Sequence, residues 1–328
     1  MEKQPKYSIY PSLLISFQNL LDYELTAEED WNKVSQAALD RGEYPGAEVG
    51  DYKLSFDEMH DKLEVELINT INRIPKGPME AADKGTAFNE IVDCLIENRK
   101  SGREDCKIST TYRGEGKTIK DWLDRNQGAI GENAYFRCLS ILNKDKVIRG
   151  EINGFTFDYD VQLCKDAAEY FRGSLTQFLA EGTMDTKYGP VRLYGYIDEW
   201  VSNQMIDIKT TSRYNFGKYE HGWQRHIYPW CVIEAGLTTE IESFTYWVLE
   251  WAYQRKGEPL TAKGIYEETY TYDHADSGRR IKAMLEAFIE WLESRKEFIQ
   301  DRKIFGGENP EGWHGTPLTE EQIAKLRA

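Results

Sequence analysis

Two short segments, Gly195-Tyr196-Ile197-Asp198 and Ile206-Asp207-Ile208-Lys209-Thr210, carry the pattern that decides the fold. They belong to two runs rich in Val, Ile, Tyr and Trp, residues 191–201 and 205–210, which only residues 202–204 separate. Such residues favour β-strands, and so short a break between two strands predicts a β-hairpin.

The acids of this hairpin are expected to face each other. Side chains alternate along a strand, so Asp207 and Lys209 share one face. If the loop consists of Ser202 and Asn203, Asp198 lies directly opposite Asp207, with Cβ atoms about 4.5–5.5 Å apart. A three-residue loop would offset the two acids by one position. Because opposed like charges are unfavourable, the first register favours a divalent cation between them. The alternative is a pair of solvated acids with Lys209 as their salt-bridge partner.

Two further motifs flank the hairpin in the sequence. Gln224 and Tyr228 stand four residues apart within 223–235, so a helix there would present an amide and a phenol on one face. Upstream, Asn89 and Asp93 have the same spacing in the segment that begins Lys84-Gly85-Thr86. Both helices could bring polar side chains to the hairpin.

The ordered pieces G-x-x-D, D-x-K-T and Q-x-x-x-Y resemble the core of the PD-(D/E)XK nucleases, specifically their RecB-like exonuclease branch. Residues 84–93 resemble the first motif of that branch, G-T-x-x-H-x-x-x-E, again in the expected order. Asn89 replaces its histidine and Asp93 replaces its glutamate. The resemblance covers residues 80–250 and implies an α/β (α+β) fold, with a restriction-endonuclease-like core in which helices flank a central mixed β-sheet.

The resemblance also implies a site. Asp198, Asp207 and the main-chain carbonyl of Ile208 would hold Mg²⁺ or Mn²⁺, and Lys209 would orient the attacking water or neutralise the phosphate. Gln224 and Tyr228 would position the scissile strand or the lysine, although a buried structural role for Tyr228 is the alternative. Further metal ligands from the first-motif helix would be Asn89 and Asp93, with Glu90 on a neighbouring face; a solvated helix face is the other interpretation of these three residues.

The remaining sequence predicts four regions. Residues 1–79 form a helical N-terminal region packed on the core, residues 80–250 the nuclease core, residues 251–304 a C-terminal helical extension and residues 305–328 a loose tail. Capping boxes predict helix starts at Thr26 and Ser55. Other patterns predict the elements between these regions: a strand over Gly154–Leu163, a helix over Lys165–Leu179, a strand over Ile241–Trp251 and a long amphipathic helix around Ile281–Phe298.

Composition limits the class of protein. With 328 residues, 40% of them hydrophobic, the chain can bury a large core. It contains no run of eighteen apolar residues and no signal-peptide core at its start, so we expect a cytoplasmic protein without a membrane partner. The five cysteines form no C-x-x-C motif, which predicts reduced thiols. Some relatives hold an iron–sulfur cluster through late cysteines; because none follows Cys231, we expect no cluster here.

The net charge of -15 argues against a protein that coats nucleic acid. Residues 203–230 nevertheless contain four basic and two acidic side chains, a local charge of +2, and aromatic residues are interleaved with them. A local patch of this kind is enough for a nuclease to bind linear DNA, double- or single-stranded.

The leading hypothesis is a metal-dependent exonuclease that acts on DNA in recombination, repair or phage DNA processing. A recombination protein is a candidate partner. The alternative is a nuclease fold with weakened catalysis that serves as a DNA-binding or scaffolding subunit, which Asn89 favours. A restriction-type endonuclease is a further alternative within the enzyme class.

Overall fold

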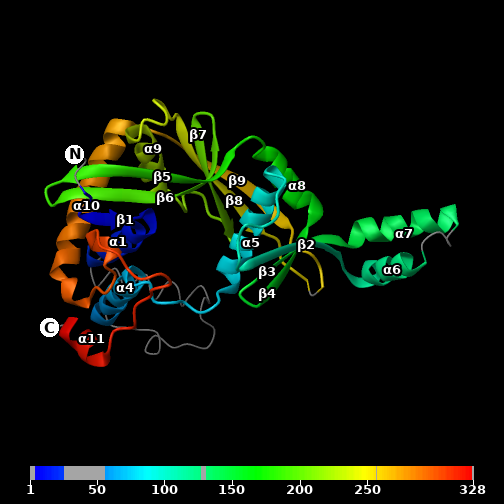
Figure 1. The fold of residues 1–328 in the computed structure, drawn as a ribbon, viewed down its shortest axis with the longest axis horizontal. Helices are drawn as coiled ribbons and strands as arrows, with labels where there is room; N and C mark the ends of the chain where they lie inside the picture. Colours follow the sequence, from blue (N-terminus) through cyan, green and yellow to red (C-terminus); the bar gives the residue numbers. More distant parts are fainter. Residues whose placement is uncertain (1–3, 26–55, 127–130, 256, 327–328) are drawn as a thin grey trace.

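A six-stranded mixed sheet forms the centre of the computed structural model, which describes residues 4–25, 56–126, 131–255 and 257–326 (Figure 1). The strand order is β1-β6-β7-β8-β9, and β5 pairs with β6 along its other edge. Pairing is parallel for β1 with β6 and for β7 with β8, and antiparallel for the others. The strands are β1 (Tyr7–Ile9), β5 (Leu175–Thr186), β6 (Gly189–Val201), β7 (Gln204–Thr211), β8 (Ser243–Trp251) and β9 (Ala262–Thr271).

A second, antiparallel sheet and most of the helices pack around this sheet (Figure 1). The small sheet has the order β2-β3-β4, and its β3–β4 hairpin turns at Asn153 and Gly154, whose φ angles of 49° and 84° suit a tight two-residue turn. Its strands are β2 (Cys106–Tyr112), β3 (Lys146–Ile152) and β4 (Phe155–Asp160). The longer helices are α1 (Pro11–Glu24), α4 (Phe56–Ile71), α5 (Glu80–Ile96), α6 (Gly114–Arg125), α7 (Glu132–Asp145), α8 (Val161–Tyr170), α9 (Gln224–Glu234) and α10 (His274–Ser294). The expected mixed α/β architecture with a central mixed sheet is confirmed.

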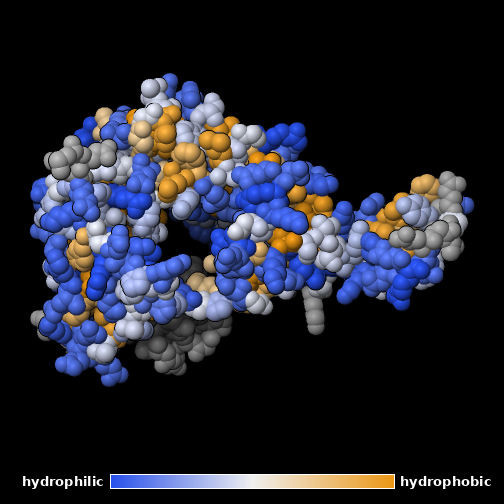
Figure 2. Space-filling model, viewed as in Figure 1, coloured by the Kyte–Doolittle hydropathy of each residue, from blue (hydrophilic) through white to orange (hydrophobic). Residues whose placement is uncertain are grey.

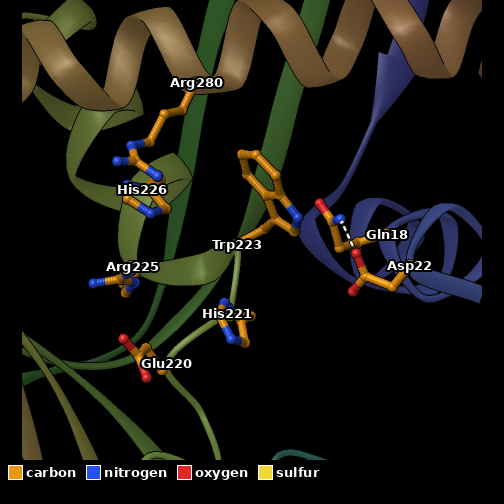
Figure 3. Close-up of a pocket in the computed structure, with 8 residues that line it drawn as sticks. All are labelled: Gln18, Asp22, Glu220, His221, Trp223, Arg225, His226 and Arg280. Atoms are coloured by element: carbon orange, nitrogen blue, oxygen red, sulfur yellow. Dashed lines mark hydrogen bonds between the residues drawn. The ribbon is translucent and has the colours of Figure 1, made fainter. Parts of the chain in front are cut away.

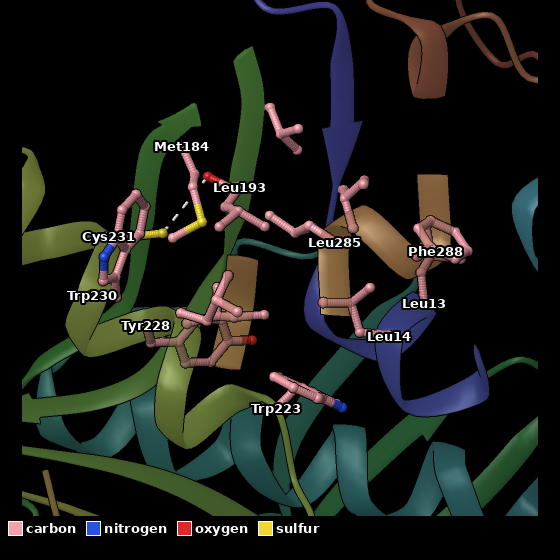
Figure 4. Close-up of a cluster of buried hydrophobic side chains, with 14 of the residues drawn as sticks. Leu13, Leu14, Met184, Leu193, Trp223, Tyr228, Trp230, Cys231, Leu285 and Phe288 are labelled. Carbon is pink, nitrogen blue, oxygen red and sulfur yellow. Dashed lines mark hydrogen bonds between the residues drawn. The ribbon is translucent and has the colours of Figure 1, made fainter. Parts of the chain in front are cut away.

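The large sheet is buried on both faces, because its strands alternate between two hydrophobic cores. On β8, Tyr246 and Val248 face one core, while Trp247 and Leu249 face the other. The first core lies between the sheet and helices α1, α9 and α10, where Phe17 packs on Phe288 at 5.2 Å between ring centroids. Its members in Figure 4 include Leu13, Leu14, Met184, Leu193, Trp223, Tyr228, Trp230, Cys231, Leu285 and Phe288.

The second core joins the sheet to α5, α8 and the small sheet. Phe88 of α5 stacks on Trp247 at 6.4 Å between ring centroids and meets Trp251 edge-on. Full burial of one such side chain contributes roughly 1.5–3 kcal/mol to folding. These contacts fix α5 against β7 and β8, beside the predicted hairpin.

The β6–β7 hairpin has the two-residue loop. Val201 pairs with Gln204 and Glu199 with Ile206, and Ser202 in the loop has φ 51°. The two-residue alternative for the loop is therefore confirmed, and this register, continued by one residue, aligns Asp198 with Asp207. Beyond the Glu199–Ile206 pair the two strands diverge, because the edge of β6 pairs with β1 at residues 191–193 instead. Asp198 therefore lies at a fork in the sheet.

Helices α6 and α7 project from the rest of the molecule as an arm (Figure 1). They are inserted between Tyr112 of β2 and Lys146 of β3, which pair with each other at its base. Trp122 and Phe136 of the arm are 44% and 58% exposed. In Figure 2 the molecule is also hollowed between the part that carries α1 and the part that carries α5.

Among the boundaries that differ from the sequence prediction, two change the kind of element to which residues belong. The strand predicted over Gly154–Leu163 ends at Asp160, because the Asp160 side chain accepts the main-chain N–H of Leu163 at 2.8 Å and caps α8. The helix predicted to reach Leu179 ends at Tyr170 instead, and β5 begins at Leu175. Backbone pairing of Leu175–Thr186 with β6 outweighs the local helical pattern.

The C-terminal tail has little regular structure before α11 (Glu320–Leu326), but it is anchored. The Gly315 N–H donates to the Asn72 carbonyl at 2.8 Å, and Leu318 is buried. The tail is therefore packed rather than loose at these positions. The predicted helix start at Thr26 and the Ser55 cap lie outside the described residues, and the four region boundaries stay predictions. Within the described ranges, no helix combines the length and apolar character that a membrane crossing needs.

Candidate active site

Asp198 lies in the fork between β6 and β7. Its Oδ2 accepts the main-chain N–H of Ile208 at 2.8 Å, so the carboxylate takes the place of a ladder partner where the strands separate. Its Oδ1 accepts the side-chain amide of Gln177 at 3.3 Å. The sheet itself thus holds this carboxylate next to β7.

Asp207 connects the hairpin to α9. Its Oδ2 lies 2.6 Å from the Lys209 Nζ, and its Oδ1 accepts the Gln224 side-chain amide at 2.6 Å. Asp207 is 3% exposed, whereas the Lys209 side chain is 28% exposed. The hairpin supplies the acid and the lysine, and the first turn of α9 supplies the amide.

Burial and mutual repulsion act together on the titration of these groups. Burial, reinforced by the charge of Asp207, raises the pKa of Asp198 to about 7. Burial also raises the pKa of Asp207, although Lys209 opposes the shift. For Lys209, burial favours the neutral amine, but Asp207 and Asp198 outweigh it and raise the pKa. The lysine therefore stays cationic beside two carboxylates that repel each other.

Tyr228 is a packing residue of the site. It is 6% exposed, and a Cβ added to Gly195 would lie 2.5 Å from its Cε1 atom. Gly195 and Tyr228 are therefore in direct contact. Only glycine leaves enough room for the tyrosine ring at position 195. Burial and the charge of Asp207 raise the pKa of Tyr228, so its hydroxyl stays protonated.

The first-motif residues lie on α5, which runs past the fork. A Cβ at Gly85 would approach the Thr210 Oγ1 to 2.7 Å, so the start of α5 is in close contact with β7. Glu90 has a structural partner, because its Oε1 accepts from Arg99 at 2.8 Å and from the Gly102 N–H at 3.1 Å. Glu90 is thus not oriented as a ligand. The buried Oδ1 atom of Asn89 lacks a hydrogen-bond partner among the described residues, and Asp93 interacts with Glu199.

Sequence reasoning missed Glu199, which is fully buried next to Asp93. Glu199 accepts a hydrogen bond from Ser174, and its carboxyl group also interacts with that of Asp93. Burial raises its pKa to about 9, and burial with the charge of Glu90 raises that of Asp93 to about 7. The sequence did contain a signal, because two consecutive acids, Asp198 and Glu199, are unusual in an apolar strand. It could not show that the partner of Glu199 is Asp93 of α5.

These side chains are suited to a hydrated divalent cation. Over the described ranges, no three His, Cys, Asp or Glu side chains form a group that could hold a metal on its own. Mg²⁺ does not require such a cage, since it is commonly held by one or two carboxylates, several waters and the substrate phosphates. The Asp198 and Asp207 carboxylates, repelling each other beside the Ile208 carbonyl, match that requirement. Asp93 contacts Glu199 instead, so its direct participation is not required.

A hollow of about 290 Å³ is formed by α1, α9, α10 and the segment before α9 (Figure 3). It does not include Asp198 or Asp207 in its lining, but the neighbours of Gln224 on both sides, Trp223 and Arg225, do line it. The other lining residues are Gln18, Asp22, Glu220, His221, His226 and Arg280.

Comparison with known proteins identifies no relative by sequence. No family model matches the chain, and no curated protein matches it significantly. Among solved structures, SSO0001 is similar over 54% of this chain and 71% of its own, at 13% identity and a TM-score of 0.29. A protein from Eubacterium rectale named "Putative exonuclease" is similar over 73% of this chain and 74% of its own, at 10% identity and a TM-score of 0.34.

Rai1 from Scheffersomyces stipitis is similar over 81% of this chain and 77% of its own, at 11% identity and a TM-score of 0.19. Similarity at these TM-scores carries no argument about fold or activity.

Proposed function

We propose that this protein is a metal-dependent nuclease that hydrolyses DNA phosphodiester bonds, acting as an exonuclease on linear DNA. The observation that carries the proposal is the fork of β6 and β7, where Asp198, Asp207 and Lys209 meet the Gln224 amide of α9. These are four residues of the motif resemblance, brought from two strands and a helix to one place.

The buried charges support a catalytic role over a structural one. Two carboxylates that repel each other in a desolvated site cost folding free energy, and a purely structural site would gain by replacing one of them. The cost is offset if a cation binds between them in the working enzyme. Mg²⁺ or Mn²⁺, when bound, would lower the pKa of a water molecule and stabilise negative charge on the phosphate.

The residues of the chain have distinct roles in this proposal. Asp198, Asp207 and the Ile208 carbonyl would hold the ion, with Asn89 and Asp93 in reach through water. Lys209 would orient the attacking water and stabilise the charge that grows on the phosphate oxygens, a task that suits a compact ammonium. Gln224 fixes the Asp207 carboxylate, and Tyr228 fixes α9 against Gly195.

The test is degradation of end-labelled linear DNA with Mg²⁺ or Mn²⁺ by the wild type and by the Asp207→Asn and Lys209→Ala variants. Removing one group that stabilises transition-state charge is expected to lower kcat on the order of 10²- to 10³-fold. The matched controls are Glu250→Gln and Lys263→Ala, because this buried strand acid also pairs with a lysine, at 2.8 Å, outside the site. Wild-type turnover that both site variants retain would reject the assignment.

A second candidate is a nuclease-fold subunit that binds DNA without efficient turnover. The observation that favours it is Asn89, a neutral amide with an unpartnered oxygen at the position where the resembled motif has histidine. DNA binding without turnover under any metal would support this candidate. Asn89→His would then be expected to restore measurable cleavage.

A restriction-type endonuclease differs in the substrate it accepts. An exonuclease needs a DNA end, so covalently closed circular DNA would resist it and the linearised form of the same plasmid would not. Cleavage of both forms at equal rates would favour the endonuclease.

A further inference from the structure

The loop between β7 and α9, residues 212–223, carries an aromatic side chain that the rest of the molecule leaves uncovered. Phe216 is 90% exposed. Single exposed apolar side chains are common on protein surfaces, so exposure alone assigns no role to this ring. Its place in the fold is more informative. The loop begins directly after the strand that holds Asp207 and Lys209, and it ends at the helix that starts with Gln224.

The pairing of β7, β8 and β9 defines two rows of residues on the face of the sheet that carries the candidate acid and lysine. In the order β7, β8 and β9, the rows are Asp207, Tyr246 and Glu268, and Lys209, Val248 and Tyr266. Paired residues point to the same face of a sheet, and neighbouring strands are about 4.8 Å apart. The β9 members of the rows therefore lie roughly 10 Å from the β7 members.

A buried carboxylate at the β9 end of one row holds the backbone of the loop. Glu268 is 2% exposed and accepts the main-chain N–H groups of Gly217 at 3.1 Å and Tyr219 at 3.3 Å. It also accepts the Tyr270 hydroxyl at 2.9 Å. Hydrogen bonds to a charged acceptor are the strong ones, so they fix the loop directly after Phe216.

Two ring contacts hold the loop on either side of Phe216 in the sequence. Tyr214 stacks on Tyr266 at 4.4 Å between ring centroids. Tyr219 packs on Tyr246 at 5.3 Å between ring centroids. Both partners belong to the two rows, so the backbone around Phe216 is held within about 10 Å of β7. The exposed ring thus projects from an anchored loop beside the candidate active site.

The charge of the loop suits a nucleic-acid strand. Residues 212–223 contain Arg213, Lys218 and a single acid, Glu220, which lines the hollow of Figure 3. The Lys218 Nζ donates to the Thr211 Oγ1 at 2.9 Å and to the Arg213 carbonyl at 3.4 Å, and these neutral partners leave its charge uncompensated. Single-strand binding sites combine positive charge along the backbone with aromatic rings on which bases stack. The loop offers both.

We propose that Phe216 stacks on an unpaired base of the DNA strand whose backbone crosses the candidate active site. This inference rests on the proposed nuclease function. Bases within a duplex stack on one another, so the base that meets the ring must be one that has left the duplex, as at a frayed end. Because the loop is anchored before DNA binds, the stacked base fixes the position of the strand relative to Asp207 and Lys209.

The test is the affinity for single-stranded oligonucleotides in EDTA, measured by fluorescence anisotropy without cleavage. Phe216→Ala is expected to raise Kd on the order of tenfold, the usual effect of removing a stacking ring. The slope of log K against log salt should not change, because no charge is removed. Phe216→Trp should bind as tightly as the wild type. Phe216→Leu keeps an apolar side chain without a π-face and should bind as weakly as Phe216→Ala.

Oligonucleotides with 2-aminopurine at successive positions from one end locate the stacked base. Emission from 2-aminopurine falls when it stacks on a ring, so at one position the wild type should quench it more than Phe216→Ala does. Tyr253→Ala is the matched control, because Tyr253 is 91% exposed and lies outside the loop, five residues beyond the position that pairs with Lys209. Its Kd and emission should equal those of the wild type. Because Phe216 is exposed, its variants should also keep the Tm of the wild type.

The results that would overturn the inference differ in what else they reject. If the wild type cleaves DNA and Phe216→Ala matches Tyr253→Ala in Kd and in 2-aminopurine emission, the stacking contact is wrong and the nuclease proposal stands. Wild-type affinity in Phe216→Leu would also reject stacking, because that side chain has no π-face. If the wild type neither binds nor cleaves DNA, both proposals are wrong.

Discussion

At the scale of single residues, the geometry of the site depends on a glycine as well as on its charged side chains. Gly195 brings β6 close enough to α9 for Tyr228 to cover it, and the same approach brings Gln224 to Asp207. Asp207 in turn pairs with Lys209. A change at the glycine should therefore act on the site through packing.

Gly195→Ala is expected to destabilise the fold by about 1–3 kcal/mol, the usual cost of overpacking a core, because its Cβ would overlap the Tyr228 ring. Urea denaturation measures the change. Gly77→Ala is the matched control, since nothing lies within 4 Å of a Cβ there. In the Tyr228→Leu background the penalty should shrink; an undiminished penalty would mean that the ring is not the obstacle.

His226 should make stability depend on pH. Burial, with Arg225 and Arg280 nearby, lowers the pKa of His226 from 6.5 to about 4. Below pH 6.5 the unfolded chain therefore binds a proton that the folded chain does not, and folding stability falls as the pH falls toward 4. The His226→Gln variant has no imidazole to protonate in the unfolded chain. As the pH falls from 7.5 to 4.5, its Tm should therefore decrease less than the Tm of the wild type. A constant difference in Tm across this range would contradict the assignment.

At the scale of elements, the fork of β6 and β7 combines a local and a distant requirement. The two-residue loop sets the register that opposes Asp198 and Asp207, and the parallel pairing of β1 with residues 191–193 separates β6 from β7 beyond it. The gap between β6 and β7 therefore requires both the hairpin loop and the pairing with β1. The opening exposes the Ile208 N–H that Asp198 accepts.

Metal binding at the fork should stabilise the fold, which gives a readout independent of activity. At 100 times its Kd, Mg²⁺ is expected to stabilise the wild type by about 2.7 kcal/mol. The raised pKa of Asp198, about 7, contributes stability to the metal-free protein that is lost as the pH rises through 7, so the Mg²⁺ increment should be larger at pH 8 than at pH 5. Thermal denaturation with and without Mg²⁺ measures it. Asp207→Asn should abolish the increment and Glu250→Gln should keep it; an equal increment in both variants would place the ion elsewhere.

At the scale of the whole molecule, the arm of α6 and α7 stands apart from both cores (Figure 1). It leaves and re-enters the small sheet at Tyr112 and Lys146, which are paired strand residues. Its apolar side chains Trp122 and Phe136 are largely exposed, so the arm adds little to the buried area. The rest of the molecule should fold without it.

Replacement of residues 113–145 by an Asn-Gly turn is expected to change the free energy of unfolding by less than about 1 kcal/mol, since closure of a shorter loop offsets the small loss of contacts. Chemical denaturation and the linear-DNA assay check stability and turnover. Loss of cooperative unfolding would show that the arm is part of the folding unit. Retained folding with weaker DNA binding would instead assign the arm to substrate contact.

The local parts of this protein could be predicted from the amino-acid order, and the contacts between distant parts could not. The hairpin and the start of α9 follow from strand alternation and a four-residue spacing, which act within a few residues. The length of the hairpin loop, and with it the register, was open between two alternatives, and the structure decided for the two-residue loop. The Asn-Gly turn between β3 and β4 is a signal of the same kind that was missed.

Packing determined the rest. Leu175–Thr186 is a strand because β6 offers it an edge, and Asp93 contacts Glu199 because α5 packs beside the fork more than 100 residues away in the chain. Trp223, Arg225 and Arg280 line one hollow only because α1, α9 and α10 meet there. The spacing of apolar residues in the sequence predicts which face of a helix or strand is buried. Which other element covers that face depends on shape and on the burial of apolar area across the whole chain.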